Sequence, residues 1–306
     1  MSGMLDLIKT LAPQEGYNLT ALPGVRILRA DRPLARTPVL YDPGIVIVLQ
    51  GSKRGYFGQQ TYLYDEQHYL AVSVPVPFTM ETDASATHPL LAIYIHLDFQ
   101  LAAELILQID QHKAFSLPTA PQSMMSSQMD ESVRLAVLGL LHALNSPLET
   151  AILGHARLRE LYFRVLTGEQ GTVMRAALAL QGQFSKIGNV VRHIHRAYAE
   201  PLTLTQLAGK ADMSVPTFHL HFKAVIRMPP MQYVKLVRLH QARMLMVRQH
   251  VTAAEAGYAV GYESPSQFTR EFKRLFGLPP AAEIKRMQRH FTVPPEQQTT
   301  IFVSSH

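Results

Sequence analysis

Two segments near the C-terminal end of the sequence repeat each other at a spacing of 50 residues. Residues 214–230 and 264–280 both follow the pattern S-x3-F-x3-F-K-x5-P-P. Phenylalanines four apart lie on one face of an α-helix, and a serine shortly before them is a favoured N-terminal cap. A short helical segment precedes each copy, with Ala211 in the first copy where the second has Gly261. The repeat therefore predicts two helix-turn-helix units.

The main helix of each copy is expected to have a buried face and an outward face. In the second copy, Gln267, Arg270 and Arg274 are spaced to form a polar stripe away from the phenylalanines. A single stripe of this kind is ordinarily a solvated face. Two copies at a fixed spacing are hard to attribute to generic amphipathic helices, so we interpret the outward faces as recognition surfaces. The helix predicted between them, residues 231–247, would be about 25 Å long and could hold them near the ~34 Å spacing of successive major grooves.

The positive charge of the sequence is concentrated in the same half. Residues 1–180 contain 13 Lys and Arg against 16 Asp and Glu, whereas residues 181–306 contain 16 against 7. The net charges of −3 and +9 indicate that the second half meets a polyanion. DNA and an anionic membrane surface both fit that description, so charge alone leaves the partner open.

The first hundred residues consist of short segments rich in β-branched and aromatic residues, separated by Gly, Pro, Asp and Gln. Regularly spaced short strands of this kind predict a small barrel or sandwich. The glycine-rich stretch 51–58 is expected to form a hairpin turn. The expected strands are 25–30, 44–52, 61–65, 68–74, 78–84 and 90–98.

Helices are predicted between these two regions, over residues 99–109, 124–144 and 150–166. The second of them contains an apolar stripe at helical spacing. Such a stripe could pack only on the barrel of its own chain, or it could join two copies of the chain. It comprises Val133, Val137, Leu140, Leu141 and Leu144.

Residues 186–288 resemble the DNA-binding domain of the AraC/XylS family of bacterial transcription activators. The matching segments are LTLTQLAGKADMSVPTFHLHFKAV, PMQYVKLVRLHQARMLM and AVGYESPSQFTREFKRLFGLPP. The first half is more loosely similar to the family's cupin-like sensor domains, through VIVLQGSKRGYFGQQTYLYDEQHYL and LRELYFRVLTGEQG. The resemblance implies an α+β fold with an N-terminal cupin-like β-barrel, dimerisation helices and a C-terminal all-α double helix-turn-helix domain. The implied divisions are 1–110 for the sensor barrel, 111–180 for the dimerisation and linker helices, 181–290 for the DNA-binding domain and 291–306 for a flexible tail.

The resemblance also implies which side chains meet DNA. Arg270 suits a bidentate contact with guanine, and Gln267 suits one with adenine. Leu220 departs from the pattern, because it stands where the second copy has Arg270 and offers only apolar contact, for example to a thymine methyl. Phosphate contacts, which orient a domain without specifying sequence, are expected from Lys223, Lys273 and Arg274. The residues implied in base readout are Pro216, Thr217, His219, Leu220, Ser266, Gln267 and Arg270.

A metal-dependent cupin enzyme with an accessory nucleic-acid-binding domain is the alternative function. Cupin metal sites commonly use an H-x-H motif, and the first half has His68, His88 and His96 without one. The H-x-H pairs at 193/195 and 219/221 lie on predicted helices, where residues i and i+2 point about 200° apart and cannot chelate together. Common catalytic and phosphate-binding motifs are also absent. We therefore expect no enzyme activity, no catalytic residue, no metal site and no cofactor.

A small-molecule site in the barrel is the least defined expectation. Tyr94 and His96 share one face of the strand 90–98 and could line a pocket, although a structural histidine is the commoner occurrence. A barrel that binds no ligand and is regulated by protein contact or by abundance is the other possibility. The candidates for ligand binding are Lys53, Arg54, Tyr64, Tyr94 and His96.

The expected partners follow from these interpretations. They are double-stranded promoter DNA, RNA polymerase, an unknown small-molecule effector and a second copy of the chain, with no membrane. The sequence has no cysteine, no apolar run near the ~18 residues of a membrane span and no signal-peptide pattern at residues 1–11. A cytoplasmic protein is therefore expected.

Overall fold

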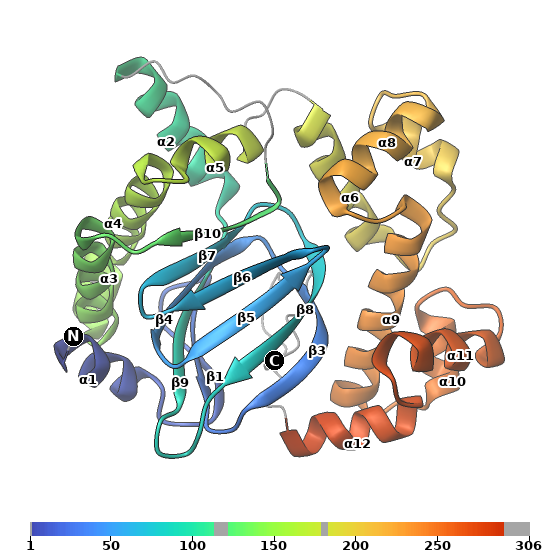
Figure 1. Ribbon diagram of the computed structural model, residues 1–306, viewed down its shortest axis with the longest axis horizontal. Helices are drawn as coiled ribbons and strands as arrows, with labels where there is room; N and C mark the ends of the chain where they lie inside the picture. Colours follow the sequence, from blue (N-terminus) through green and yellow to red (C-terminus); the bar gives the residue numbers. More distant parts are fainter. Residues whose placement is uncertain (1, 113–121, 179–182, 291–306) are drawn as a thin grey trace.

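The computed structural model describes residues 2–112, 122–178 and 183–290 of the 306-residue chain. A curled antiparallel sheet with helices against its outer side forms the first half, and a group of helices forms the second (Figure 1). This is the α+β arrangement predicted from the sequence, with the barrel present as a half-barrel. The predicted tail, 291–306, lies outside the described residues.

The sheet contains ten strands in the order β1-β2-β9-β4-β7-β6-β5-β8-β3, with β10 paired to β7. Its central strands are buried on both faces. Alternate residues of a strand point to opposite sides of the sheet, and here each side has its own apolar core. In β9, Ile93 and Ile95 face the helices, whereas Ala92 and Tyr94 face the inside of the curl. The strands are β1 Gly16–Leu19, β2 Val25–Ala30, β3 Leu34–Tyr41, β4 Gly44–Gln50, β5 Ser52–Phe57, β6 Gln60–Asp65, β7 His68–Val72, β8 Val76–Asp83, β9 Leu90–His96 and β10 Met124–Gln128.

Helices α1 to α5 pack against the outer face of the sheet (Figure 1). The apolar stripe of α3 is buried there, together with Ile45 and Ile93, so it packs on the barrel of its own chain. Of the two possibilities for this stripe, the structure shows the first. The helices are α1 Ser2–Leu11, α2 Phe99–His112, α3 Glu131–Leu144, α4 Pro147–Thr167 and α5 Gly171–Leu178.

The predicted helix 124–144 is wrong in its first part. Residues Met124–Gln128 form β10, which pairs antiparallel with β7 in the register Met125↔Ala71. The helix begins only at Glu131, where the Asp130 carboxylate caps it by accepting from the backbone N of Val133 at 2.8 Å. Methionine and glutamine favour helices locally, but pairing with a distant strand overrides that preference.

Three further strands, β1, β3 and β5, were not expected from the sequence. The stretch predicted to be a hairpin turn is mostly β5, and the turn itself lies at Gly58, whose φ of 63° suits glycine. The other expected strands are confirmed within a few residues at each end.

The second half contains the two predicted helix-turn-helix units, α7–α8 and α10–α11, joined by the long helix α9 (Figure 1). The predicted caps are confirmed, because Ser214 accepts from the backbone N of Thr217 and Ser264 from that of Gln267. Pro229 precedes α9 without a side-chain cap. The helices are α6 Gln183–Ala197, α7 Leu204–Lys210, α8 Val215–Ile226, α9 Pro230–Gln249, α10 Ala253–Ala259, α11 Pro265–Phe276 and α12 Pro280–His290.

The turns of the two units differ in length by one residue. Their first helices are capped by Thr203 and Thr252, which are 49 apart, whereas Ser214 and Ser264 are 50 apart. The residue with positive φ in the first turn is Asp212, at 53°, and Gly261 takes the equivalent place in the second, at 86°. The predicted match of Ala211 with Gly261 is therefore wrong by one position. An aspartate tolerates the left-handed conformation better than most residues do, which explains how the first turn dispenses with glycine.

The first helix-turn-helix unit shares one continuous apolar core with the inside of the half-barrel, whereas the second has a core of its own. Hydrogen bonds also cross the shared boundary. The Tyr233 hydroxyl of α9 donates to the Pro75 carbonyl at 3.0 Å, and the Ser123 hydroxyl donates to the Val225 carbonyl of α8 at 2.5 Å. The first unit is thus attached to the barrel at several points.

In the part of the chain that the structure describes, we find no helix that combines the length and the apolar character needed to cross a membrane.

Candidate nucleic-acid interface

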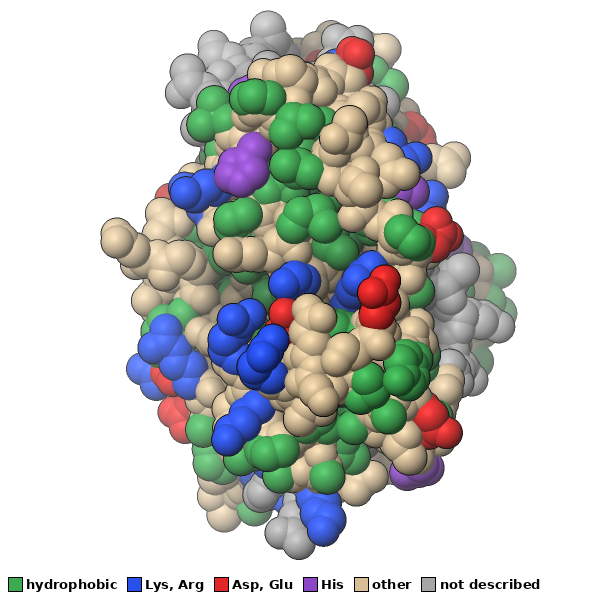
Figure 2. All heavy atoms as spheres, turned by 90° about the vertical axis from the view of Figure 1, so that its right-hand side faces the viewer, with side chains coloured by type: hydrophobic (Ala, Val, Ile, Leu, Met, Phe, Trp, Pro, Cys, Tyr) green, Lys and Arg blue, Asp and Glu red, His purple; other side chains and the backbone are tan. Residues whose placement is uncertain are grey.

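Helices α8 and α11 lie along the outer side of the C-terminal half, and Figure 2 faces that side. Lysine and arginine side chains gather over its lower part, around α9 and α11 (Figure 2). The upper part, around α8, is mostly hydrophobic or uncharged, with a histidine at the surface. The two units therefore offer chemically different surfaces on one face of the molecule.

Every residue of α8 implied in DNA binding is exposed. The two phenylalanines of the repeat, Phe218 and Phe222, are fully buried on the opposite side. Leu220 is 67% exposed, so its side chain is accessible on this face. The Thr217 hydroxyl lies 2.8 Å from that of Ser214, so it takes part in the helix cap. The exposed residues are Pro216, Thr217, His219, Leu220 and Lys223.

The outward face of α11 is polar and basic. Ser266, Arg270, Lys273 and Arg274 are exposed, and Gln267 is half-buried. Among the described residues, neither of the neighbouring acids, Glu263 and Glu271, pairs with the Arg270 guanidinium. Its five donors are therefore available to a ligand in solvent.

A buried carboxylate lies beneath this face. Glu271 accepts hydrogen bonds from the Tyr262 hydroxyl at 2.9 Å, the Lys235 ammonium at 3.1 Å and the Gln267 amide Nε2 at 3.3 Å. Burial acts to raise the pKa of Glu271, but these three donors outweigh it and hold the pKa below its usual value. The carboxylate is consequently ionised at neutral pH and can only accept.

Sequence reasoning missed this cluster, because Glu271 lies beside the polar stripe and its partner Lys235 comes from α9. Lys235 and Glu271 also border a groove of about 600 Å³ between α9 and α11. Its floor contains Met231, Leu236 and Leu239, and its polar lining includes Lys235, Glu271 and Arg274. The groove separates the connecting helix from the second recognition helix.

Three of the five candidate ligand residues face the inside of the half-barrel. Tyr64 and Tyr94 belong to the buried core there, and Lys53 is 1% exposed. The Lys53 ammonium lies 3.5 Å from the Tyr41 hydroxyl, which lies 3.3 Å from that of Tyr64. Burial lowers the pKa of Lys53 well below its usual value. An amine and two hydroxyls are thus brought together inside the curl.

The other two candidates lie elsewhere. Arg54, next to Lys53 on β5, points outward and its Nε pairs with Glu81 at 2.8 Å. His96 lies at the end of β9, where burial, and then the charge of Arg26, lower its pKa. The structure therefore does not bring Arg54 or His96 to the cluster around Lys53.

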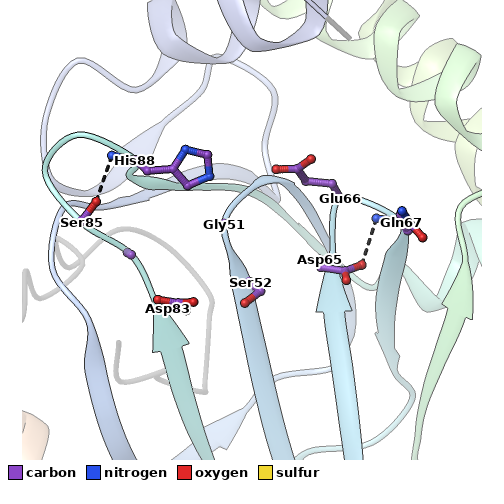
Figure 3. Close-up of a pocket in the computed structure, with 9 residues that line it drawn as sticks. Gly51, Ser52, Asp65, Glu66, Gln67, Asp83, Ser85 and His88 are labelled. Atoms are coloured by element: carbon purple, nitrogen blue, oxygen red, sulfur yellow. Dashed lines mark hydrogen bonds between the residues drawn. The ribbon is translucent and has the colours of Figure 1, made fainter.

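A second hollow, of about 420 Å³, opens at the end of β5, β6 and β8 (Figure 3). Asp65, Glu66 and Asp83 line it together with His88. The Asp65 carboxylate already accepts from the backbone N of Gln67 at 2.9 Å. Within residues 2–112, 122–178 and 183–290, no group of three or more His, Asp or Glu side chains is placed to hold a metal ion.

The chain matches two family models. Residues 21–173 match the AraC-type transcriptional regulator N-terminus, which is half of the chain, and residues 207–286 match a helix-turn-helix domain. The metalloenzyme alternative gains no support from either model.

Known proteins resemble the chain over different lengths. A putative AraC-like transcription regulator of Streptomyces lividans is 32% identical over 101 residues, which is 33% of this chain and 32% of that protein, so the match spans about a third of that relative. The Msm operon regulatory protein of Streptococcus mutans is 22% identical over 271 residues, covering 86% of this chain and 91% of that protein.

The fold resembles that of ToxT from Vibrio cholerae, solved with an unsaturated fatty acid bound. The TM-score is 0.58 at 12% sequence identity, and the superposition covers 89% of this chain and 97% of ToxT. A half-barrel with outer helices, two helix-turn-helix units on one face and the two family matches lead to one conclusion. The chain belongs to the AraC-type transcriptional regulators and has the DNA-binding helix-turn-helix domain of that family.

Proposed function

We propose that this regulator reads its target promoter through two successive major grooves, with α8 in one and α11 in the next. The observation that supports this most directly is that the outward side chains of both helices are exposed on one face. Helix α9 joins them and, at 20 residues, is about 30 Å long. That length is close to the ~34 Å between successive major grooves.

The proposed roles of the side chains follow from their chemistry. Arg270 and Gln267 read base edges by hydrogen bonds, with Ser266 beside them, while Leu220 makes apolar contact in the first groove. Pro216, Thr217 and His219 border that contact. Lys223, Lys273 and Arg274 hold phosphates and set the register on the duplex. The proposed divisions remain 1–110, 111–180 and 181–290.

Selection from a random double-stranded library by the full chain, followed by sequencing, tests the proposal. We expect one enriched motif with two conserved segments about 10 base pairs apart. Affinity for the selected duplex should fall as salt rises, with a log–log slope of about −0.9 for each neutralised phosphate. A library without enrichment, or a slope near zero, would contradict the proposal.

We propose, second, that the inside of the half-barrel takes a small effector with an acidic group and an apolar body. The apolar walls of the curl, with the Lys53 amine and the Tyr41 and Tyr64 hydroxyls among them, suit such a molecule. ToxT, which has a similar fold, was solved with an unsaturated fatty acid. Binding inside the barrel would influence DNA affinity, and DNA would influence effector affinity by the same factor.

Thermal shift of the full chain with palmitoleate and with short carboxylates tests this second proposal. We expect a ligand that raises the melting temperature of the wild type to lose its effect in Lys53→Met. Arg54→Met is the matched control, because it removes a cation from the next residue, on the outer face of the same strand. Equal loss in both variants would contradict a site inside the barrel.

We propose, third, that two copies of the chain associate through α4. Leu148 and Ile152 are 73% and 72% exposed, and Phe163 follows on the same side of the helix at 40%. An exposed apolar stripe of this kind is typical of an interface, and a symmetric dimer suits paired half-sites. Sedimentation should give a dimer that Ile152→Glu breaks. Leu107→Glu on α2, at a residue 63% exposed, is the control and should leave the dimer intact.

We propose, fourth, that the protein acts in the cytoplasm, bound to the chromosome, and that its output is activation, for which it would also contact RNA polymerase. Transcription in vitro from a promoter that contains the selected motif tests it. More transcript with the protein than without it would support activation, and less would indicate repression.

A further inference from the structure

We infer that Glu271 is a positioning residue that fixes which way the Gln267 amide faces, and so makes the second recognition helix select adenine over guanine. This inference rests on the proposed function, because it requires that Gln267 contact a base edge. Nothing in the sequence repeat indicates it, since the first unit has His221 at the place of Glu271.

The argument begins with the number of donors on one carboxylate. Glu271 accepts from Tyr262 through Oε2, and from both Lys235 and Gln267 through Oε1. Its side chain is 9% exposed, so water has little access to it. An ionised carboxylate has no proton to donate, and burial and the nearby Glu271 charge raise the pKa of Tyr262, which keeps that hydroxyl protonated. The Glu271 carboxylate that faces Gln267 is thus an acceptor at neutral pH.

An acceptor of this kind settles the polarity of the amide. If Gln267 turned over, its carbonyl Oε1 would face the carboxylate at about the 3.3 Å now spanned by Nε2, and two acceptors would repel each other in a poorly hydrated place. Nε2 therefore stays on the side of Glu271, one turn further along α11. This leaves Oε1 and the second N–H of the amide for a ligand.

The remaining edge of the amide is complementary to one purine. Adenine presents N7 as an acceptor and N6 as a donor in the major groove, which match the second N–H and Oε1 of Gln267. Guanine presents two acceptors, N7 and O6, and O6 would meet Oε1 of the fixed amide. A free glutamine can swing its Nε2 so that both N–H bonds point at guanine N7 and O6, but Gln267 would have to give up its bond to Glu271 to do so.

The connection to α9 gives the cluster its rigidity. Lys235 reaches Glu271 from the connecting helix, and Tyr262 reaches it from the turn before α11. Contacts from α9 and from the turn before α11 thus hold the Glu271 carboxylate in place, and the carboxylate in turn holds the Gln267 amide. The first unit has no counterpart, because Thr217 at the place of Gln267 is bonded to its own helix cap.

The experiment compares base preference in four full-length chains, each used to select from a random double-stranded library. The chains are wild type, Glu271→Gln, Gln267→Ala and the double variant. Affinities are then measured on the wild-type motif with adenine or guanine at the position that Gln267→Ala alters. Glu263→Gln is the control, because it neutralises an exposed acid just before α11.

We expect wild type and Glu263→Gln to prefer adenine about tenfold at that position. In Glu271→Gln the uncharged amide accepts more weakly, so Gln267 can release it and point both N–H bonds at guanine, and the preference should fall below about threefold. With Gln267→Ala the preference should vanish, and adding Glu271→Gln should change nothing further at that base pair.

Three results would overturn the inference. They are an unchanged preference in Glu271→Gln, a further loss at that base pair in the double variant, and a uniform loss of affinity across all bases in Glu271→Gln. The last would mean that Glu271 only stabilises the fold. Gln267→Ala changes a half-buried surface position and is expected to fold. It therefore identifies the base pair that Gln267 contacts even if Glu271→Gln is unstable. If the wild-type chain enriches no motif, the proposed function fails and this inference fails with it. That result differs from the three above, in which the wild type does select a motif.

Discussion

In the first helix-turn-helix unit, α8 turns Leu220 and His219 to the solvent, whereas in the second unit α11 presents Gln267 and Arg270 in the corresponding region. The frame beneath them is the same, with a capping serine and two fully buried phenylalanines in each. The two units therefore share a frame and differ in the side chains that they expose. Two helix-turn-helix units of the same fold can therefore offer different side chains to a ligand.

The surroundings of the two units differ as well. Phe218 belongs to a core that continues into the half-barrel, whereas Phe268 belongs to a small core formed by the second unit and α9. Tyr233 strengthens the first connection by donating to Pro75 while the His195 ring lies 2.6 Å from its hydroxyl. The first unit is thus packed on the barrel, whereas the second unit forms its small core with α9.

Removing one phenylalanine from each core should give the largest difference. Phe218→Ala and Phe268→Ala should each cost about 3–5 kcal/mol, because each leaves a cavity in a fully buried site. Phe218→Ala should also lower protection of the barrel strands, and Phe268→Ala should leave them protected. Hydrogen exchange resolved by peptide measures both. Equal loss of barrel protection in the two variants would contradict separate cores.

Acid should weaken both units through buried histidines. Burial lowers the pKa of His195 well below its usual value, and burial followed by the charges of Arg243 and His195 does the same for His240. The unfolded chain takes up these protons below about pH 6.5 and the folded chain does not. Stability should therefore be unaffected above that pH and fall below it, by up to about 1.4 kcal/mol per pH unit for each histidine.

Urea unfolding between pH 7.5 and 5.5 measures this dependence. His195→Gln, which keeps a donor for Tyr233, should reduce the pH slope by about half. His219→Gln is the control, because it makes the same substitution at an exposed histidine. An undiminished slope in His195→Gln would show that other groups govern the acid response.

The two reading faces should differ in what a truncation costs. Arg270→Ala should lose about 1–3 kcal/mol on the selected duplex and relax preference at one base pair, expected to be a guanine. Leu220→Ala should lose less and act only where a thymine methyl is contacted. Binding to a panel of single-base variants of the duplex shows whether Arg270 contacts a base. If Arg270→Ala weakens every duplex alike, Arg270 holds a phosphate instead.

The smallest effects should be those that the two units share. Lys223→Ala and Lys273→Ala occupy equivalent places in the repeat, and each should reduce the magnitude of the salt slope by about 0.9 without altering sequence preference. Titrations at three salt concentrations on selected and scrambled duplexes measure this. A change in base preference for only one of them would show that the units also differ in how they hold the backbone.

Features set by local periodicity could be predicted from the sequence. The caps Ser214 and Ser264 and the buried phenylalanines depend only on spacing within one helix, so a repeat was enough to find them. The central strands were equally accessible, because their β-branched residues have no competing helical period.

Features set by distant partners could not be predicted in the same way. Residues Met124–Gln128 become a strand only because β7 is there to pair with them. Adjacent residues Lys53 and Arg54 had to lie on opposite faces, but which one faces inward depends on the pairing of β5 with β6 and β8. Glu271 is unremarkable on α11 until Lys235 and Tyr262 surround it.

The hydrogen bond from Ser123 to the Val225 carbonyl, with the apolar core around it, bears on how such proteins can be recombined. A chimera could join this barrel to the DNA-binding half of another relative. Its side chains would then not match at the seam, which is the boundary where the half-barrel and the first unit share one core. Successful exchange would require that the seam residues travel with one parent, including Pro75 and Tyr233. Exchange of the second unit alone would disturb this boundary less, because α10 and α11 form a separate core with α9, although α11 also contacts β3.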